Sequence, residues 1–111
     1  MFFNDKMTPE SKAAVGWTTT ATLEEANKIA QGLVATGLAR CVQISAPVTS
    51  VYTWKGVTET ETEYRITVKF LSARAREIEN YLNQHHSYEV PQWIWIEAAG
   101  ASEAYGKWLA G

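Results

Sequence analysis

Residues Val48–Leu71 read VTSVYTWKGVTETETEYRITVKFL. The first part, Val48–Trp54, is rich in β-branched and aromatic residues, which favour strands. Lys55-Gly56 then predicts a tight turn, because glycine tolerates the positive φ that a short hairpin needs. From Val57 onward the side chains alternate, and one face carries three carboxylates: Glu59, Glu61 and Glu63. We therefore predict a long β-hairpin that projects from the domain and is supported by a partner subunit, since a lone hairpin is marginal in water.

A strand and a helix are predicted before the hairpin. Residues 13–20 (AAVGWTTT) form a short strand. Thr22 and Glu25 fit a capping box in which Glu25 reaches back to the Thr22 N–H. Apolar residues then recur at helical spacing from Leu23 to Thr36, and Gly37 follows as a left-handed C-terminal residue. The strand that leads into the hairpin, residues 40–46, is interrupted by Pro47, which indicates an edge position or a bulge.

The elements after the hairpin complete one compact pattern. Ser72 is placed to cap a helix that ends near His86. Residues 92–98 (QWIWIEA) alternate as a strand, and residues 102–109 form a short terminal helix. The order βαββαβ predicts an α+β, ferredoxin-like sandwich: a four-stranded antiparallel sheet with two helices on one face.

The composition bounds the class of protein. The 111 residues carry a formal net charge of −2 and no basic cluster, which argues against a nucleic-acid partner. No apolar run approaches the roughly 20 residues of a membrane span, and no signal peptide is recognisable, so we expect a cytoplasmic protein. We expect one domain, residues 13–111, after a flexible lead-in of residues 1–12. Five tryptophans, two of them on one face of a single strand, favour oligomerisation.

Two sequence blocks carry a resemblance to a known family. The first is Thr49–Gly56 (TSVYTWKG), and the second is His86–Pro91 (HSYEVP), at a matching distance along the chain. Together with Leu38–Val42 (LARCV) they resemble the CutA (divalent-cation tolerance) family over residues 13–110. The resemblance implies a ferredoxin-like fold and a homotrimer similar in architecture to the PII signalling trimers, in which each hairpin continues into the neighbouring subunit's sheet. It also implies tolerance to divalent cations, chiefly copper.

The chain departs from the family pattern at three positions. Ser87 stands where the family usually has proline, Gln92 where an acidic residue is common, and Thr18 where some members have cysteine. The last change removes a soft thiolate, which copper(I) prefers as a ligand. This chain therefore has one soft ligand fewer for a copper site than those relatives.

The candidate metal ligands are Glu63, His86, His85 and Cys41. Neutral imidazole is a common copper and zinc ligand, but adjacent histidines at a helix end diverge by about 100° and do not share one ion. The alternative for these histidines is a favourable position beside the helix dipole. The resemblance places Glu63 in a polar cleft near His86 and between subunits, and the alternative is an ion pair with Lys or Arg. Cys41 has a buried, inert thiol as its alternative.

Lys69, Tyr88 and Trp54 are expected to line the same cleft, where Lys69 either neutralises Glu63 or binds an anion. No nucleophile, P-loop or dinucleotide motif is present, so no enzymatic activity is expected. Three functions remain open. They are a trimer that binds copper or zinc without an obligatory cofactor, a PII-like sensor of a small anionic ligand, and a trimeric scaffold or anchoring protein.

Overall fold

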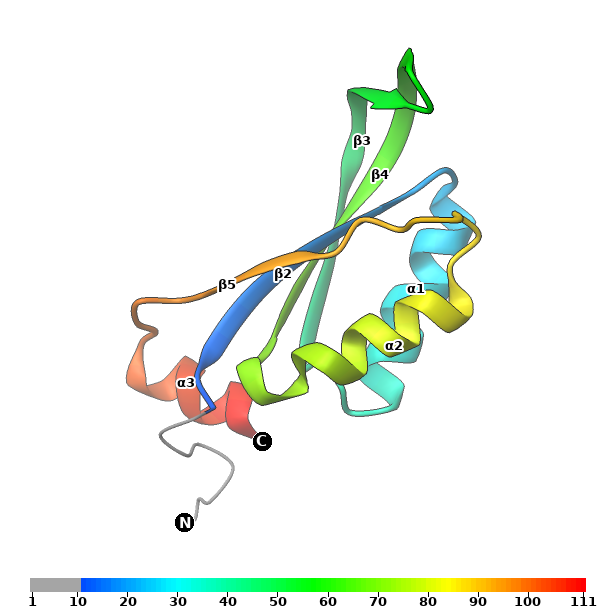
Figure 1. Cartoon of the computed structure of the whole chain (residues 1–111). Coiled ribbons are helices and arrows are strands. Elements are labelled where there is room, and N and C mark those ends of the chain that lie inside the picture. Colours follow the sequence, from blue (N-terminus) through cyan, green and yellow to red (C-terminus); the bar gives the residue numbers. More distant parts are fainter. Residues whose placement is uncertain (1–10) are drawn as a thin grey trace.

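A computed structural model describes residues 11–111 of the chain (Figure 1). Its elements, in order, are β2 (Ala13–Thr20), α1 (Leu23–Ala35), β3 (Cys41–Trp54), β4 (Val57–Leu71), a 3₁₀ turn (Ser72–Arg74), α2 (Ala75–His85), β5 (Ile94–Glu97) and α3 (Glu103–Ala110). Residues 1–10 of the predicted lead-in lie outside the described part. The last two residues of that lead-in are held by the fold, because Ser11 is buried and the Lys12 N–H donates to Ser72 Oγ over 2.9 Å.

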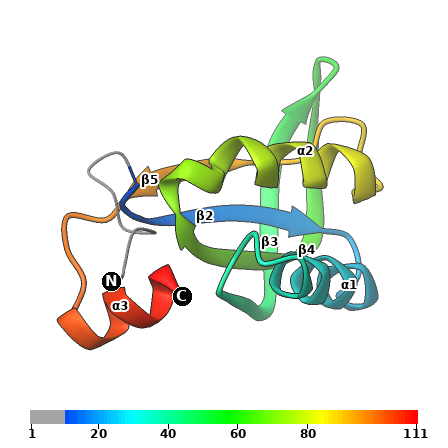
Figure 2. The ribbon, with the colours of Figure 1, turned by 90° about the horizontal axis from the view of Figure 1, so that it is seen from below.

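The four strands form one antiparallel sheet in the order β3-β4-β2-β5. Helices α1 and α2 cover one face of this sheet, and α3 lies at the end remote from the hairpin tip (Figures 1 and 2). Strand β5 is shorter than predicted, although the Ala98 N–H still donates to Ala13 O over 2.9 Å. The ferredoxin-like arrangement predicted from the sequence is confirmed.

The β3–β4 hairpin has the predicted turn and the predicted irregularity. Lys55 and Gly56 both take positive φ, 52° and 81°, which matches the twist of the two strands. The register shifts between Ile44 and Pro47, so the interruption at proline is a bulge within one continuous strand. The hairpin extends the molecule to 50 × 25 × 24 Å, with a radius of gyration of 15.0 Å. A compact domain of this length has about 13 Å.

The helix caps differ from the prediction in two places. Thr22 Oγ1 accepts from the Glu25 N–H over 3.1 Å, as predicted for a helix N-terminus. The Glu25 carboxylate, however, bonds to Ser87 and not back to Thr22. Ser72 does not cap α2 either, since it begins the 3₁₀ turn and its Oγ accepts from the Lys12 N–H instead.

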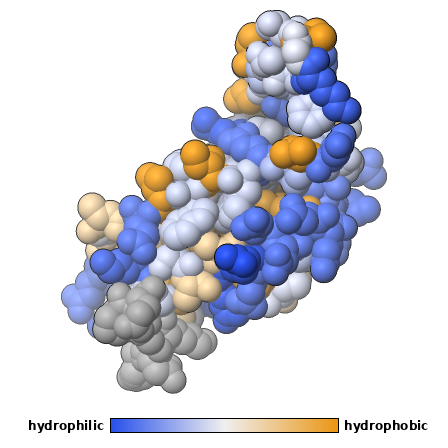
Figure 3. Space-filling view, in the orientation of Figure 1, coloured by the Kyte–Doolittle hydropathy of each residue, from blue (hydrophilic) through white to orange (hydrophobic). Residues whose placement is uncertain are grey.

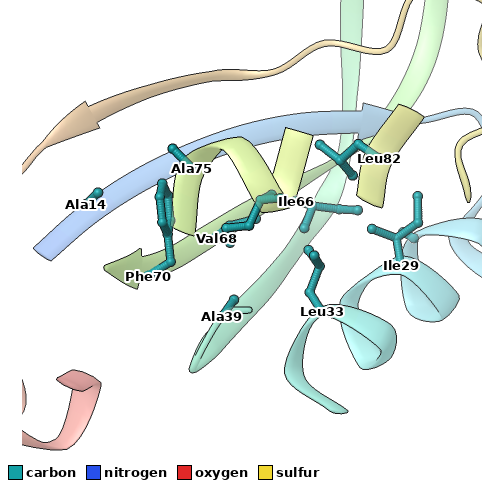
Figure 4. Close-up of a cluster of buried hydrophobic side chains, with 11 residues drawn as sticks. Ala14, Ile29, Leu33, Ala39, Ile66, Val68, Phe70, Ala75 and Leu82 are labelled. Carbon is teal, nitrogen blue, oxygen red and sulfur yellow. The ribbon is translucent and has the colours of Figure 1, made fainter. Parts of the chain in front are cut away.

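One hydrophobic core lies between the sheet and the two helices (Figure 4). Ile66, Val68 and Phe70 point into it from alternate positions of β4, and Leu33 and Leu82 meet them from α1 and α2. Trp93 packs on Phe70 with ring centroids 5.6 Å apart, and Trp95 contacts the same ring at 5.9 Å. Trp93 therefore packs against the core, whereas Trp95 is 37% exposed and touches it only at the Phe70 ring.

No helix within residues 11–111 has the length and apolar character needed to cross a membrane.

Candidate functional site

A buried carboxylate lies where the hairpin leaves the body of the domain. Glu63 is on β4 opposite Val48, one position beyond the last residue pair between β2 and β4. Its exposed fraction is 6%, and Tyr88 Oη donates to its Oε2 over 2.7 Å. Burial, and then the bond to Glu63, raise the pKa of Tyr88, so the phenol remains a neutral donor. Within residues 11–111, no Lys, Arg or His nitrogen lies within 4.0 Å of this carboxylate.

The surroundings of Glu63 are acidic. Glu59 and Glu61 precede it on the same face of the hairpin, opposite Tyr52 and Ser50 of β3. Partial desolvation, followed by the charges of Glu61, Glu63 and Glu59, raises the pKa of Tyr52. These carboxylates create a negative potential on this face, which favours a cation over an anion.

His86 lies beside Tyr88, but both of its ring nitrogens are engaged. Its side chain is 0% exposed. Nε2 lies 2.7 Å from Thr19 O, and because a carbonyl only accepts, Nε2 carries the proton. Nδ1 accepts from the Tyr88 N–H over 3.1 Å. His86 in this arrangement supports the backbone before Tyr88 and has no lone pair left for a metal ion.

Glu25, which sequence reasoning did not place at the site, holds the same segment from α1. Its two carboxylate oxygens accept from the Ser87 N–H (2.7 Å) and from Ser87 Oγ (3.0 Å). One of these oxygens also lies 3.6 Å from His86 Nδ1. Ser87 is one of the departures from the family pattern, and this departure is the one feature of the sequence that could have pointed to a contact with Glu25 at this position. A proline at this position has neither of the two donors.

His85 diverges from His86, as predicted for adjacent residues. Its Nδ1–H donates to Tyr81 O over 2.9 Å, and its ring stacks on Tyr81 at 4.0 Å. The proton on Nδ1 leaves the lone pair on Nε2. The side chain is exposed and lines a shallow groove between α1 and α2, together with Glu24 and Lys28. His85 is thus the histidine with an available ring nitrogen, in a different place from Glu63.

The other predicted site residues are far from Glu63 within one chain. Lys69 is six positions further along β4, or about 20 Å away. It pairs with Cys41 across the strands and lies over the ring of Tyr105 at 5.8 Å. Burial, and then a hydrogen bond with the Cys41 thiol, raise the pKa of Tyr105. Trp54 is at the hairpin tip beside Lys55. Within residues 11–111 of one chain, Lys69 and Trp54 therefore do not share a cleft with Tyr88, and Lys69 does not pair with the Glu63 of its own chain. The cleft between subunits stays a prediction.

Two further departures from the family pattern are explained in part. Gln92 Oε1 accepts from Thr19 Oγ1 over 3.4 Å, which joins the segment after Tyr88 to β2. Thr18 is fully buried, and its Oγ1 has no hydrogen-bond partner within residues 11–111. No group of three or more His, Cys, Asp or Glu side chains within the described residues is arranged to hold a metal ion.

Comparison with known proteins identifies the family. The family model described as "CutA1 divalent ion tolerance protein" matches residues 14–111, which is nearly the whole described chain. The chain belongs to the CutA1 family. Among solved structures, the periplasmic divalent cation tolerance protein CutA from Archaeoglobus fulgidus superimposes with a TM-score of 0.84 at 31% identity, covering 87% of this chain and 94% of that one. The resemblance inferred from the two sequence blocks is confirmed.

Relatives within the CutA1 family differ in length and location. The probable divalent-cation tolerance protein CutA homolog of Encephalitozoon cuniculi is 38% identical over 88 residues, covering 79% of this chain and 76% of that protein. The chloroplastic CutA of Arabidopsis thaliana is 30% identical over 95 residues, covering 86% of this chain and 52% of that protein. The chain spans about half the length of this relative and of the Xenopus laevis homolog, of which it covers 56%. Since CutA1 relatives include chloroplastic and periplasmic proteins, the cytoplasmic location stays a prediction.

Proposed function

We propose that this CutA1 chain forms a homotrimer that binds a divalent metal ion, copper or zinc, with Glu63 as the carboxylate ligand. The supporting observation is that Glu63 is buried beside one neutral donor, Tyr88, with no cationic side chain of residues 11–111 within ion-pairing distance. A buried carboxylate without a positive partner is costly, by several kcal/mol. A cation from outside the chain would offset this cost, and the acidic hairpin face would attract it.

Uncovered apolar surface supports an oligomer. Ile94 and Ile96 of β5 pair with Trp17 and Val15 of β2. These positions alternate with the core residue Ala14, so they occupy the sheet face opposite α1 and α2. Ile94 and Ile96 are 59% and 56% exposed. Figure 3 shows apolar side chains along the hairpin and over the part of the molecule labelled β5 in Figure 1. Burial of this face against other copies would stabilise the assembly, and neighbouring subunits would supply the remaining metal ligands.

The two histidines have different roles in this proposal. His86 supports the segment that carries Tyr88, because both of its nitrogens are bonded to backbone groups. His85 keeps a free Nε2 at the surface groove and acts as a separate, weaker ligand. We propose a binding role and no enzymatic role for the chain, in the cytoplasm.

A second candidate function has one specific observation in its favour. At the end of the sheet remote from Glu63, Arg40 lies 4.9 Å from the centroid of the Trp108 ring, and Lys69 lies over Tyr105. Two cations beside aromatic rings would suit a small anionic ligand of a PII-like sensor. A scaffold role would require neither site.

Calorimetric titration of the metal-stripped protein with zinc and with copper tests the first proposal, after light scattering has established the trimer. We expect a Kd of about 1 μM or lower. Glu63→Gln should weaken binding at least tenfold. Glu61→Gln is the matched control, since it removes an equal charge from the same face at an exposed position and should leave the Kd within about twofold. Absent binding, or equal binding by the Glu63→Gln variant, would refute the metal site.

A further inference from the structure

We infer that Glu25 is a positioning residue for Glu63, to which it is linked by a chain of hydrogen bonds through residues 86–88. The role in metal binding rests on the proposed function, whereas the positioning of Tyr88 does not. Glu25 is on α1 and makes no hydrogen bond or ion pair with Glu63, so any effect it has on Glu63 passes through Ser87, His86 and Tyr88.

The segment after α2 is held mainly by polar contacts. Ser87 is exposed, and both of its donors bond to the Glu25 carboxylate. His86 bonds to Thr19 O on one side and accepts from the Tyr88 N–H on the other, with Glu25 3.6 Å from the same nitrogen. Tyr88 then donates to Glu63. Glu25 therefore fixes the backbone one residue before the phenol that orients the buried carboxylate.

Glu25 is itself firmly placed. Its backbone N–H donates to Thr22 Oγ1 at the capped start of α1, and its side chain is 18% exposed. Charge-assisted bonds from a carboxylate that is already positioned are stronger than neutral ones and lose less entropy on forming. A rigid helix thus serves as the anchor for an otherwise exposed turn.

Ser87 makes this link available in this chain. His86 has extended backbone angles, φ −90° and ψ 142°, which a following proline also favours. Proline restricts the chain covalently but donates no hydrogen bond. In the present sequence the restriction comes from the two bonds between Ser87 and Glu25.

A plain alternative is that Glu25 only stabilises the start of α1 through the helix dipole. Glu24 is the matched control for this alternative, because it lies in the same first turn, is exposed, and has no hydrogen bond to residues 86–88. Loss of either carboxylate removes the same favourable interaction with the dipole. Only loss of Glu25 should disturb Tyr88.

The experiment compares Glu25→Ala, Glu25→Gln and Glu24→Ala with the wild-type protein. In the metal-free state, NMR follows amide exchange at Ser87 and Tyr88 and the ring signals of Tyr88, with Glu63→Ala as the reference for a lost bond. We expect Glu25→Ala to speed exchange at both amides and to shift the Tyr88 ring signals toward their Glu63→Ala positions. Glu25→Gln should lie between, because its amide oxygen still accepts one bond. Glu24→Ala should match wild type.

Zinc calorimetry on the same variants adds the functional readout. Residues that orient a metal ligand typically change affinity by 10- to 100-fold, so we expect about tenfold weaker zinc binding for Glu25→Ala and no change for Glu24→Ala. Unchanged Tyr88 signals in both Glu25 variants would overturn the inference. So would shifted signals with a wild-type zinc Kd. If wild type itself binds neither zinc nor copper, the proposed metal function is refuted, and the NMR comparison alone decides whether Glu25 positions Tyr88.

Discussion

Removal of the Tyr88 hydroxyl tests whether Glu63 is a buried, charged acceptor. Tyr88→Phe leaves the ring in place and deletes the donor that lies 2.7 Å from Glu63 Oε2. With an exposed fraction of 6%, the carboxylate gains little from solvent in exchange. Hydrogen bonds to charged groups contribute about 1.5–3 kcal/mol. We therefore expect the free energy of unfolding to fall by about 2 kcal/mol, which changes the folded-to-unfolded ratio by about 30-fold.

Urea denaturation, followed by tryptophan fluorescence at one fixed chain concentration, measures this loss. The m-value should not change, since the surface exposed on unfolding is the same. Tyr52→Phe is the control: Tyr52 is 40% exposed and faces the same carboxylates, and its variant should stay within about 0.5 kcal/mol of wild type. Adding Glu63→Gln to Tyr88→Phe removes the unpaired charge, so the two changes should couple by about 1 kcal/mol or more. A Tyr88→Phe loss below about 0.5 kcal/mol, with no coupling, would refute a buried charged Glu63.

Three other changes test separate parts of the structure. The pKa of Tyr88 is raised above the ordinary value of about 10, so folded Tyr88 keeps its proton at pH values where the unfolded chain loses it. Urea denaturation at several pH values should therefore show the free energy of unfolding falling as the pH rises above 10, more steeply in wild type than in Tyr88→Phe. Gly56→Ala places a residue with a side chain at φ 81°, which should cost about 1–2 kcal/mol, whereas Gly100→Ala is the control, with equally open space and no positive φ. Amide exchange near the hairpin tip should accelerate about 5- to 30-fold in Gly56→Ala only. Leu33→Ala opens a cavity in the fully buried core and should cost about 2–5 kcal/mol in the same denaturation assay, and a loss below 1 kcal/mol would contradict the packing described.

Local patterns predicted most of the fold. The alternation in β4, the Lys55-Gly56 turn and the Thr22 cap depend on residues close in sequence, and all three are present. The ends of β5 and the fate of Ser72 were predicted wrongly, because each depends on a distant partner: β5 pairs with β2, and Ser72 bonds to Lys12.

The site was harder to predict for the same reason. The bond from Tyr88 to Glu63 and the bonds from Ser87 to Glu25 join segments that no local periodicity relates. The family resemblance implied that Glu63, His86 and Tyr88 lie in one region together with Lys69 and Trp54, and the structure of one chain brings only the first three together. Sequence reasoning could not assign the two nitrogens of His86, which are set by backbone groups of Thr19 and Tyr88. The metal ion and the trimer remain predictions.

The long hairpin also has a consequence for the order in which the sheet assembles. At its tip Trp54 pairs with Val57, only three positions along the chain, and each further pair extends a ladder that has already formed. Formation of the β3–β4 hairpin from its tip therefore closes only short loops and costs little conformational entropy. Strand β5, by contrast, joins β2 through pairs such as Val15 with Ile96, from nearly opposite ends of the described chain. We therefore expect β5 to be the last strand added, so that substitutions near the turn should slow folding and substitutions in β5 should mainly accelerate unfolding.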